Sequence, residues 1–436
     1  MFKTIRNAFA IPDIRKKLFF TLFIIIIFRI GSVIPVPFVD IQGLQQAMGG
    51  MGQDSIFAYV NTMTGGAFAN ATIFAMGITP YINSSIIMQL LCVAIPALER
   101  LSKEGEDGRK KIAAITRYVS VLLGLIQGIA YFFYLKGSNL LLFREGFSVW
   151  FAAFVIVLTF TAGTAFMMWL GEQINERGIG NGISILLFAG IVARLPLTVM
   201  QIIDFFKYAG LGGAFTKYYF VTPIFIILFF AIIWIITFMQ DAERRIPVQY
   251  AKRVVGRKMY GGQSSHLPIK VALGGVMPVI FASSILSIPS TLEMFFPAPE
   301  GSFGAGIYAA FRPDGWLYLV LYFLLILAFA YFYTTIQYNP VEMANNLKQN
   351  NGTIPGIRPG QPTAEFIRKI LSRITLIGAL FLAFIAIVPS VYTAVAGLRG
   401  LSMGGTSVII VVGVALETVK QMESQMMMRH YKGFLD

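Results

Sequence analysis

Residues 18–37 read LFFTLFIIIIFRIGSVIPVP, an apolar run with a single charged side chain, Arg29. Arg15, Lys16 and Lys17 come directly before it. A helix needs roughly 20 mostly apolar residues to cross a bilayer, because over about 30 Å of hydrocarbon its backbone polar groups can bond only within the chain. The stretch meets that length, so it predicts a membrane-spanning helix whose basic flank stays in water.

The same stretch superficially resembles a secretory signal peptide, because basic residues precede its apolar run. No small-residue cleavage site follows it, and Val33 to Pro37 continue the span, so we interpret it as an uncleaved first helix. A charge at the bilayer centre costs about 2.5 to 3.5 kcal/mol on insertion scales. We therefore expect Arg29 to face protein or water, or to reach toward the interface, in a packing or orienting role.

Nine further apolar stretches follow the first. Hydrophobic residues make up 56% of the 436 residues and charged residues only 13%, which is outside the usual range of soluble domains. The ten predicted spans are Leu18 to Pro37, Ile73 to Pro96, Ala114 to Leu135, Val149 to Leu170, Ile183 to Ile203, Phe220 to Met239, Val271 to Pro289, Trp316 to Ile336, Ile374 to Thr393 and Thr406 to Val419. The last is short, and we expect its helix to continue beyond Lys420 into water.

Lys and Arg residues concentrate in every second connection between these spans. They are frequent before residue 18, in 99–111, in 240–270, in 337–373 and after 419. The alternate connections carry only Lys136, Arg144, Lys207, Lys217, Arg312 and Arg399. Since basic loops stay in the cytoplasm, both termini are predicted to be cytoplasmic. This asymmetry also explains most of the formal charge of +14 without nucleic-acid binding.

Several kinds of chemistry have no support in the sequence. No GxxxxGK[ST] motif is present, so the chain is not expected to hydrolyse ATP or to be an enzyme. Cys92 is the single cysteine, and His266 and His430 lie far apart, so we expect no disulfide, metal or cofactor. The spans also lack the recurring acidic or histidine pattern of proton-coupled carriers.

Two connections are longer than helical bundles normally need. Residues 240–270 and 337–373 are both basic, and loops of this length usually serve a function or are disordered. The sequence IPGIRPG at 354–360 favours a defined turn that presents Arg358. The alternative, that these charges only orient the chain, explains their sign but not the length of the loops.

The segment before the second span has an intermediate character. Residues 61–70, NTMTGGAFAN, are too polar to span and too apolar for an ordinary loop. A short half-helix folded back into the bundle fits this composition. Interrupted helices near the midplane often mark a transport path.

A series of short motifs occurs in order along these segments: TGGA at 64–67, ITPYI at 78–82, GIGNGIS at 178–184, RIP at 245–247 with YAKR at 250–253, SHLP at 265–268, PGIRPG at 355–360 and GGTS at 404–407. One such motif is a weak signal, but the set is specific. Over nearly its whole length the chain resembles the SecY family, the central channel subunit of the bacterial Sec protein translocase.

The resemblance implies an all-α integral membrane protein in which ten transmembrane helices form two pseudo-symmetric five-helix halves around a central hourglass pore. The implied segments are a cytoplasmic N-terminal segment (1–17), an N-terminal half (18–203), an external hinge connection (204–219), a C-terminal half (220–419) and a cytoplasmic tail (420–436). The implied function is to pass unfolded, signal-bearing polypeptides across the membrane and to release transmembrane segments into lipid.

The resemblance also implies residues for each part of such a channel. A plug covers 56–70, with Thr64, Gly65, Gly66, Ala67 and Phe68, and a lateral gate between the second and seventh spans includes Asn83 and Ile288. The implied pore ring consists of Ile78, Ile82, Ile183, Leu187, Ile280 and Ile410. Leu187 departs from the β-branched residue common there but remains apolar. Spacing agrees, because residues four apart share a helix face, but spacing alone would place these side chains in a core or against lipid.

Partners follow from the same resemblance. The basic loops are expected to dock the SecA ATPase or the ribosome through Arg244, Arg245, Lys252, Arg253, Arg257, Lys258 and Arg358, whose charge steers association. SecE and SecG subunits, signal sequences, unfolded polypeptides and lipids complete the expected partners. The expected location is the bacterial cytoplasmic (inner) membrane.

The alternative is a ten-span secondary transporter of a small solute. Such a carrier can share an inverted repeat and an interrupted helix, but it predicts a polar binding site near the midplane. This sequence places aliphatic residues there.

Overall fold

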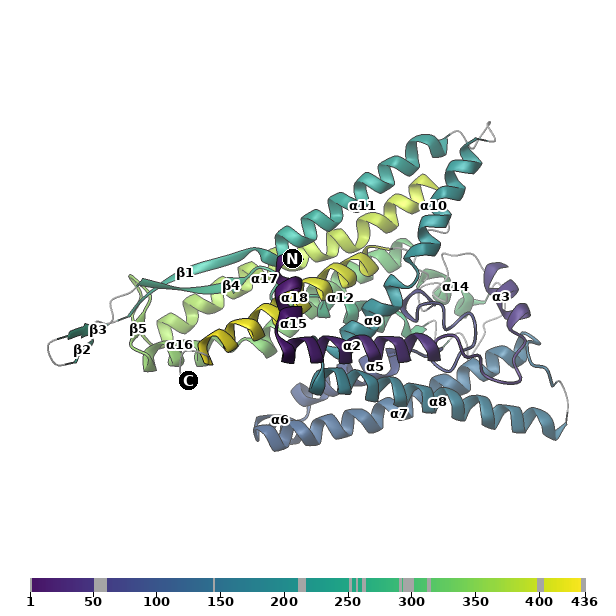
Figure 1. The fold of residues 1–436 in the computed structure, drawn as a ribbon, viewed down its shortest axis with the longest axis horizontal. Coiled ribbons are helices and arrows are strands. Elements are labelled where there is room, and N and C mark those ends of the chain that lie inside the picture. Colours follow the sequence, from purple (N-terminus) through teal and green to yellow (C-terminus); the bar gives the residue numbers. More distant parts are fainter. Residues whose placement is uncertain are drawn as a thin grey trace.

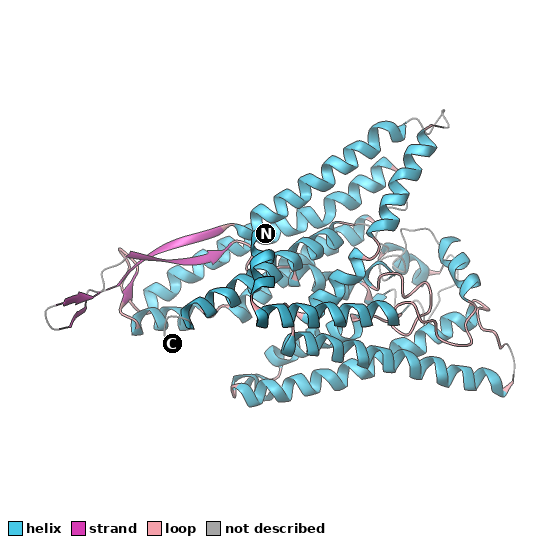
Figure 2. Cartoon of the chain, in the orientation of Figure 1, coloured by secondary structure: helices cyan, strands magenta, loops and turns pink. Residues whose placement is uncertain are grey.

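The computed structural model of the protein describes residues 2–50, 61–143, 146–210, 217–250, 253–255, 258–260, 264–289, 292, 302–311, 315–397 and 404–432. It is mostly helical (Figure 1). The strands gather at one end of the molecule (Figure 2). The expectation of helical membrane spans is therefore confirmed, and the strands belong to the two long basic connections.

The helices follow one another along the whole chain. Up to residue 209 they are α1 (Phe2–Ala10), α2 (Pro12–Gly31), α3 (Ile41–Gly50), α5 (Thr79–Ala94), α6 (Pro96–Lys103), α7 (Glu106–Gly137), α8 (Phe147–Arg177), α9 (Gly182–Val192) and α10 (Leu195–Ala209). Beyond it they are α11 (Tyr218–Asp241), α12 (Met277–Leu286), α14 (Phe303–Ala310), α15 (Trp316–Gln337), α16 (Pro340–Gln349), α17 (Gln361–Ala396) and α18 (Gly405–Lys432).

Seven described helical segments are long and apolar enough to cross a membrane, or eight when a bent pair is counted as one span. The chain is therefore a multi-pass membrane protein. The first and seventh predicted spans are present as helices but fall outside this group. The first, α2, has 20 residues but begins among basic side chains, and the seventh, α12, has 10 residues. The count of ten spans stays a prediction.

The first span differs from its predicted limits. Helix α2 begins at Pro12, whose fixed φ and missing N–H suit a first helical turn. It ends at Gly31, because Pro35 and Pro37 follow, and instead of continuing the helix Pro35 pairs with Thr72 as an isolated bridge. The Val36 N–H donates to the Ala71 carbonyl at 2.9 Å. The predicted end of the first span is thus extended chain.

The second span was predicted to begin at Ile73, but the helix begins only at Thr79. Gly65, Gly66, Ala71 and Gly77 have φ values of 68°, 92°, 42° and 58°. No right-handed helix continues through left-handed positions, so residues 64–78 form successive turns. At the other end Pro96 stops the helix, and α6 leaves at an angle of 102° to α5.

The seventh span is shortened for a similar reason. Gly275 has a φ of 55°, so the helix begins after it, at Met277, with Pro278 in its first turn. The last span behaves as expected, because α18 runs from Gly405 to Lys432, well beyond the apolar part of the sequence.

Two helical groups meet around one continuous apolar core. In the first, α7 contacts α5 and α8, and α8 contacts α2 and α9; in the second, α15 contacts α12 and α17, and α18 contacts α11 and α17. The groups touch where α5 meets α12 and where α9 meets α18. The largest cluster of buried apolar side chains draws on both groups, so the core lies at their junction.

The two basic connections fold together into one small sheet. Strand β1 (Glu243–Tyr250) pairs antiparallel with β4 (Ser264–Lys270) and with β5 (Gly352–Thr353), in the order β4-β1-β5. Strands β2 (Arg253–Val255) and β3 (Lys258–Tyr260) form a separate two-stranded ribbon. The sheet and α16 cover an apolar cluster that includes Ile246, Val248 and Ile367.

The N-terminal helix lies against the C-terminal one. The Thr4 hydroxyl donates to Glu423 at 3.0 Å, and the Lys17 ammonium donates to the Gln425 side chain at 3.3 Å. Ala8, Ile14 and Met422 share a small apolar cluster. The start of the chain is therefore fixed beside α18.

Candidate functional site

Two small cavities lie at the junction of the helical groups, each about 30 Å³ in volume. Both are lined by Ile82 of α5, Leu187 of α9 and Ile280 of α12. The three side chains therefore lie between the cavities. Each cavity has room for no more than about two water molecules, so the three residues close the passage from one to the other.

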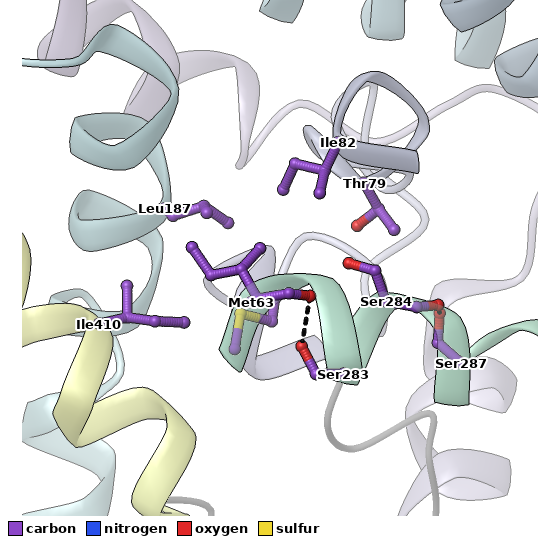
Figure 3. A pocket seen from close by; sticks show the side chains of 9 residues that line it. Met63, Thr79, Ile82, Leu187, Ser283, Ser284, Ser287 and Ile410 are labelled. Atoms are coloured by element: carbon purple, nitrogen blue, oxygen red, sulfur yellow. Dashed lines mark hydrogen bonds between the residues drawn. The ribbon is translucent and has the colours of Figure 1, made fainter. Parts of the chain in front are cut away.

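Two more predicted ring residues lie beside these three. Ile410 of α18 lines the cavity that also contains Met63 (Figure 3), and Ile183 of α9 lines the other. Ile78 is buried in the same apolar cluster but lines neither described cavity. The structure thus brings five of the six predicted residues around one constriction.

Local sequence explains why α9 presents its side chains there. The Asn181 side chain caps the helix by accepting from the N–H groups of Ile183 and Ser184, at 3.1 and 3.3 Å. A Cβ added to Gly182 would meet the Gly171 carbonyl, so glycine permits close contact with α8. Because α9 starts at a fixed point, Ile183 and Leu187 project one helical turn apart toward the centre.

The constriction is apolar, and no charged side chain lines either cavity. A narrow aliphatic passage excludes water, and ions that would have to shed their hydration cannot enter it. Such a ring offers no directional bond to a solute. Within the described residues no group of three or more His, Cys, Asp or Glu side chains is placed to hold a metal ion.

The predicted plug residues lie against one side of this ring. Met63 lines the same cavity as Ile82 and Ile410 (Figure 3). Residues 61–70 are tied internally: the Asn61 side chain accepts from the Ala69 N–H at 2.9 Å, and the Phe68 N–H donates to the Thr64 hydroxyl at 3.2 Å. Positions 56–60 of the predicted plug lie outside the described residues.

Close backbone contact joins this segment to α9. A Cβ built on Gly65 would lie 3.0 Å from the Gly190 carbonyl oxygen and 2.9 Å from Arg29 Nη1. A Cβ built on Gly190 would lie 2.6 Å from the Met63 carbonyl oxygen. Neither position has room for a side chain. The two glycines therefore let the segment sit directly on the helix that carries Ile183 and Leu187.

Two arginines approach this segment from different helices. Arg29 Nη1 is buried and makes no hydrogen bond to the described residues, in agreement with the expectation that Arg29 faces protein. Arg194, which follows α9, donates from Nη1 to the Thr62 hydroxyl at 3.3 Å. The sequence analysis did not single out Arg194, although a base next to Leu195 and Pro196, inside an apolar stretch, was a signal for it.

The contact between α5 and α12 differs in detail from the predicted gate. Thr79 of α5 and Ser283, Ser284 and Ser287 of α12 line the cavity, and the Thr79 and Ser284 hydroxyls face it (Figure 3). Asn83 is half-buried and Ile288 is 46% exposed, and neither lines the cavity. A seam of hydroxyl groups therefore lies between the two helices. Three serines within five residues of an apolar helix were the sequence signal for it.

The sheet brings predicted docking residues to one end of the molecule. Because β1 pairs with β5, the connection carrying Arg244 and Arg245 lies beside the one carrying Arg358. All three side chains are exposed. Arg245 forms an ion pair with Glu243 at 2.7 Å, and no ion pair within the described residues involves Arg244 or Arg358.

The turn that presents Arg358 is fixed from below. Ile354 is buried, and the Ile357 N–H donates to its carbonyl at 3.1 Å. Gly356 has a φ of 82°, which favours glycine, and the Thr363 hydroxyl donates to the Arg358 carbonyl at 2.8 Å. The guanidinium therefore projects from a rigid base, as the prolines and glycines predicted.

The other predicted docking residues lie at or near the two-stranded ribbon. Arg253 begins β2 and Lys258 begins β3. Lys252 and Arg257 lie outside the described residues.

Comparisons with known proteins agree with this geometry. The SecY family model matches residues 72–419. The chain is 45% identical over 439 residues to the protein translocase subunit SecY of Bacillus subtilis, and all of both chains is covered. The solved structure of a protein-conducting channel is similar, with a TM-score of 0.65 at 17% identity over 94% of this chain and 92% of the other.

Two further solved structures share the fold. One is a SecY protein whose plug domain is described as stabilising the closed channel and maintaining a membrane seal, with a TM-score of 0.62 at 16% identity. The other is Sec61 in a canine ribosome–channel complex, with a TM-score of 0.61 at 15% identity. Both matches cover 94% of this chain and 92% of the other. Together with the sequence identity over the whole chain, these matches establish that the protein belongs to the SecY family.

Proposed function

We propose that this chain is the protein-conducting channel subunit of a bacterial Sec translocase. The observation that carries the proposal is the aliphatic constriction of Ile82, Leu187 and Ile280 between two small cavities, with residues 61–70 seated against one side of it. An apolar ring resists ions at rest and can widen around an unfolded polypeptide without binding it. The small-solute carrier is not favoured, since neither cavity offers a polar cluster for a substrate.

The N-terminal half (18–203) and the C-terminal half (220–419) are proposed to separate about the 204–219 connection. Contact between the halves at the gate side is the hydroxyl-lined seam of α5 and α12, which is weaker than a fully apolar interface. An apolar signal helix entering this seam gains by partitioning into lipid. The plug then leaves the ring and the polypeptide passes.

We place both termini and the β-sheet in the cytoplasm. The basic residues that predict this orientation support it, as does the packing of α1 against α18. The exposed Arg244, Arg245 and Arg358 would then face the cytoplasm, where SecA or a ribosome supplies the driving force. The relative in the canine complex is bound to a ribosome. SecE and SecG complete the proposed assembly.

The test is ATP-dependent protease protection in vesicles containing this chain, SecE and SecG, with SecA added outside. A signal-bearing preprotein is expected to become protected only when ATP is present, and the same preprotein without its signal is expected to stay accessible. Protection that does not require ATP, or its absence while SecA binds the intact chain, would contradict the proposal.

A disulfide across the gate is expected to block insertion. Cysteines at Thr79 and Ser284 face the same cavity, so oxidation would tie α5 to α12 (Figure 3). The measurement is crosslinking of a signal sequence to lipid, with and without reductant. The same experiment with cysteines at Asn83 and Ile288 compares the gate positions expected from the family. Normal insertion through an oxidised 79/284 pair would place the gate elsewhere.

Substituting Gly190→Ala is expected to raise ion leakage of the resting channel. The new Cβ meets the Met63 carbonyl at 2.6 Å, so the plug segment or α9 must shift. Overpacking of this kind costs about 1–3 kcal/mol, which favours the unsealed state by about tenfold or more. Gly306→Ala is the control, because nothing lies within 4 Å of its built Cβ. Equal leak currents for the two variants in planar bilayers would refute the proposed seat.

A further inference from the structure

Two side chains outside the family motifs hold the base of the plug segment. Tyr131 comes from α7 and Arg194 follows α9, so both belong to the first helical group. They contact the segment at Phe68 and at Thr62, near its two described ends.

Tyr131 makes a fully buried contact. Its side chain is 0% exposed, and its hydroxyl donates to the Phe68 carbonyl at 2.8 Å. The Tyr131 and Phe68 ring centroids lie 4.8 Å apart, and Phe160 of α8 packs edge-on against Tyr131 at 5.2 Å. A buried carbonyl that loses its donor has no water to replace it, so this bond fixes the backbone at Phe68.

Arg194 fixes the other end through a hydrogen bond that carries charge. Its Nη1 donates to the Thr62 hydroxyl, while its Nε is buried without a hydrogen-bond partner among the described residues. A guanidinium that is poorly satisfied at membrane depth gains from each polar contact it keeps. Because Arg194 directly follows the helix of Ile183 and Leu187, this bond ties the plug segment to the ring itself.

The opposite side of the segment is held differently. Met63 faces Ile280 and Ser283 of the second helical group across the cavity (Figure 3). The thioether of Met63 makes at most weak polar contacts. Separation of the two groups therefore breaks apolar contact on one side and leaves the bonds from Tyr131 and Arg194 on the other.

We propose that Tyr131 and Arg194 are positioning residues that hold the plug base against the ring and thereby set how apolar a signal segment must be to open the channel. This inference rests on the proposed channel function. Opening requires the inserted signal to offset the loss of the plug's seat. A weaker seat lets a less apolar signal suffice, while a strong signal opens either form.

The test compares two preproteins in vesicles with SecE, SecG and SecA. One carries an intact signal, and the other carries the same signal with one Arg in its apolar core. Tyr131→Phe and Arg194→Gln, singly and together, are measured against two control variants. Tyr134→Phe changes a tyrosine on the same helix whose hydroxyl interacts with Ser138, and Lys207→Gln removes a base that pairs with Asp204.

The expected result is a change in the ratio of the two protected products. In the double variant, translocation of the defective preprotein should rise about tenfold relative to the intact one, the change that follows from about 1.4 kcal/mol. Resting ion leakage should rise with it. Arg194→Lys, which keeps the charge, should restore much of the discrimination, and both control variants should match the unsubstituted chain.

Three outcomes would overturn the inference. An unchanged ratio in the double variant shows that these residues do not set discrimination. A parallel fall for both preproteins, with loss of bound SecE, shows a structural role alone. If the unsubstituted chain translocates neither preprotein, the channel function itself fails, and this is distinguished from the other two because it needs no variant.

Discussion

Arg358→Glu is expected to reduce SecA-driven transport by about one to two orders of magnitude. Arg358 is exposed on a turn whose neighbours are buried or hydrogen bonded, so its charge is presented outward. Reversing one charge in a complementary interface opposes like charges at a cost of several kcal/mol and slows association. The measurement is the initial rate of ATP-dependent preprotein protection over a range of SecA concentrations.

Arg109→Glu is the matched control, since Arg109 is also an exposed base in a predicted cytoplasmic connection but lies in α7, away from the sheet. It should leave the rate nearly unchanged. Thermal unfolding of the Arg358 variant should also match the parent, because the side chain is exposed and no ion pair within the described residues involves it. Transport at the parental rate would remove Arg358 from the docking surface.

The docking loops show which properties sequence reasoning reaches. Their length and charge predicted a surface with a function, and the glycines and prolines predicted the turn at Arg358. The strands were not predicted, because Pro247 and Pro268 argue against a sheet. The structure resolves the conflict through register: β5 pairs only with Gln249 and Tyr250, so at Pro247 strand β1 has β4 as its single neighbour and no second partner needs the missing N–H.

The spans show a second limit. Apolar composition located all the long helices, since hydrocarbon rewards apolar residues wherever they fall. It does not distinguish a helix from apolar chain folded in turns. Four left-handed positions between Gly65 and Gly77 moved the start of α5, and Gly275 shortened α12. Apolar residues around these glycines stay inside the protein because they pack under the ring instead of facing lipid.

The ring depended on the family resemblance more than on spacing. Positions four apart share a face, but this describes lipid-facing and core positions equally well. Only the arrangement of three separate helices makes Ile82, Leu187 and Ile280 common to two cavities. The anchors at Tyr131 and Arg194 were not predicted at all, since their partner at Phe68 is 63 residues from the first, and their partner at Thr62 is 132 residues from the second.

Replacing two members of the ring is expected to have the largest effect on the seal. In the double variant Ile82→Ser with Ile280→Ser, hydroxyls replace aliphatic side chains that line both cavities. Burying an isoleucine is favourable by about 1.5–3 kcal/mol, and the reluctance of water to occupy the ring falls by a similar amount for each residue removed. Ion conductance of the resting channel should therefore rise by about a hundredfold or more.

The control is Ile227→Ser on α11, whose side chain is 69% exposed on the outside of the bundle. It makes the same chemical change away from the centre, so the leak should stay at the parental level. ATP-dependent transport by the ring variant should persist, because a translocating polypeptide fills the opening and the docking surface is untouched. A tight double variant would mean that the plug seals the channel without the ring, and a leaky Ile227→Ser variant would mean that the leak reports damaged packing.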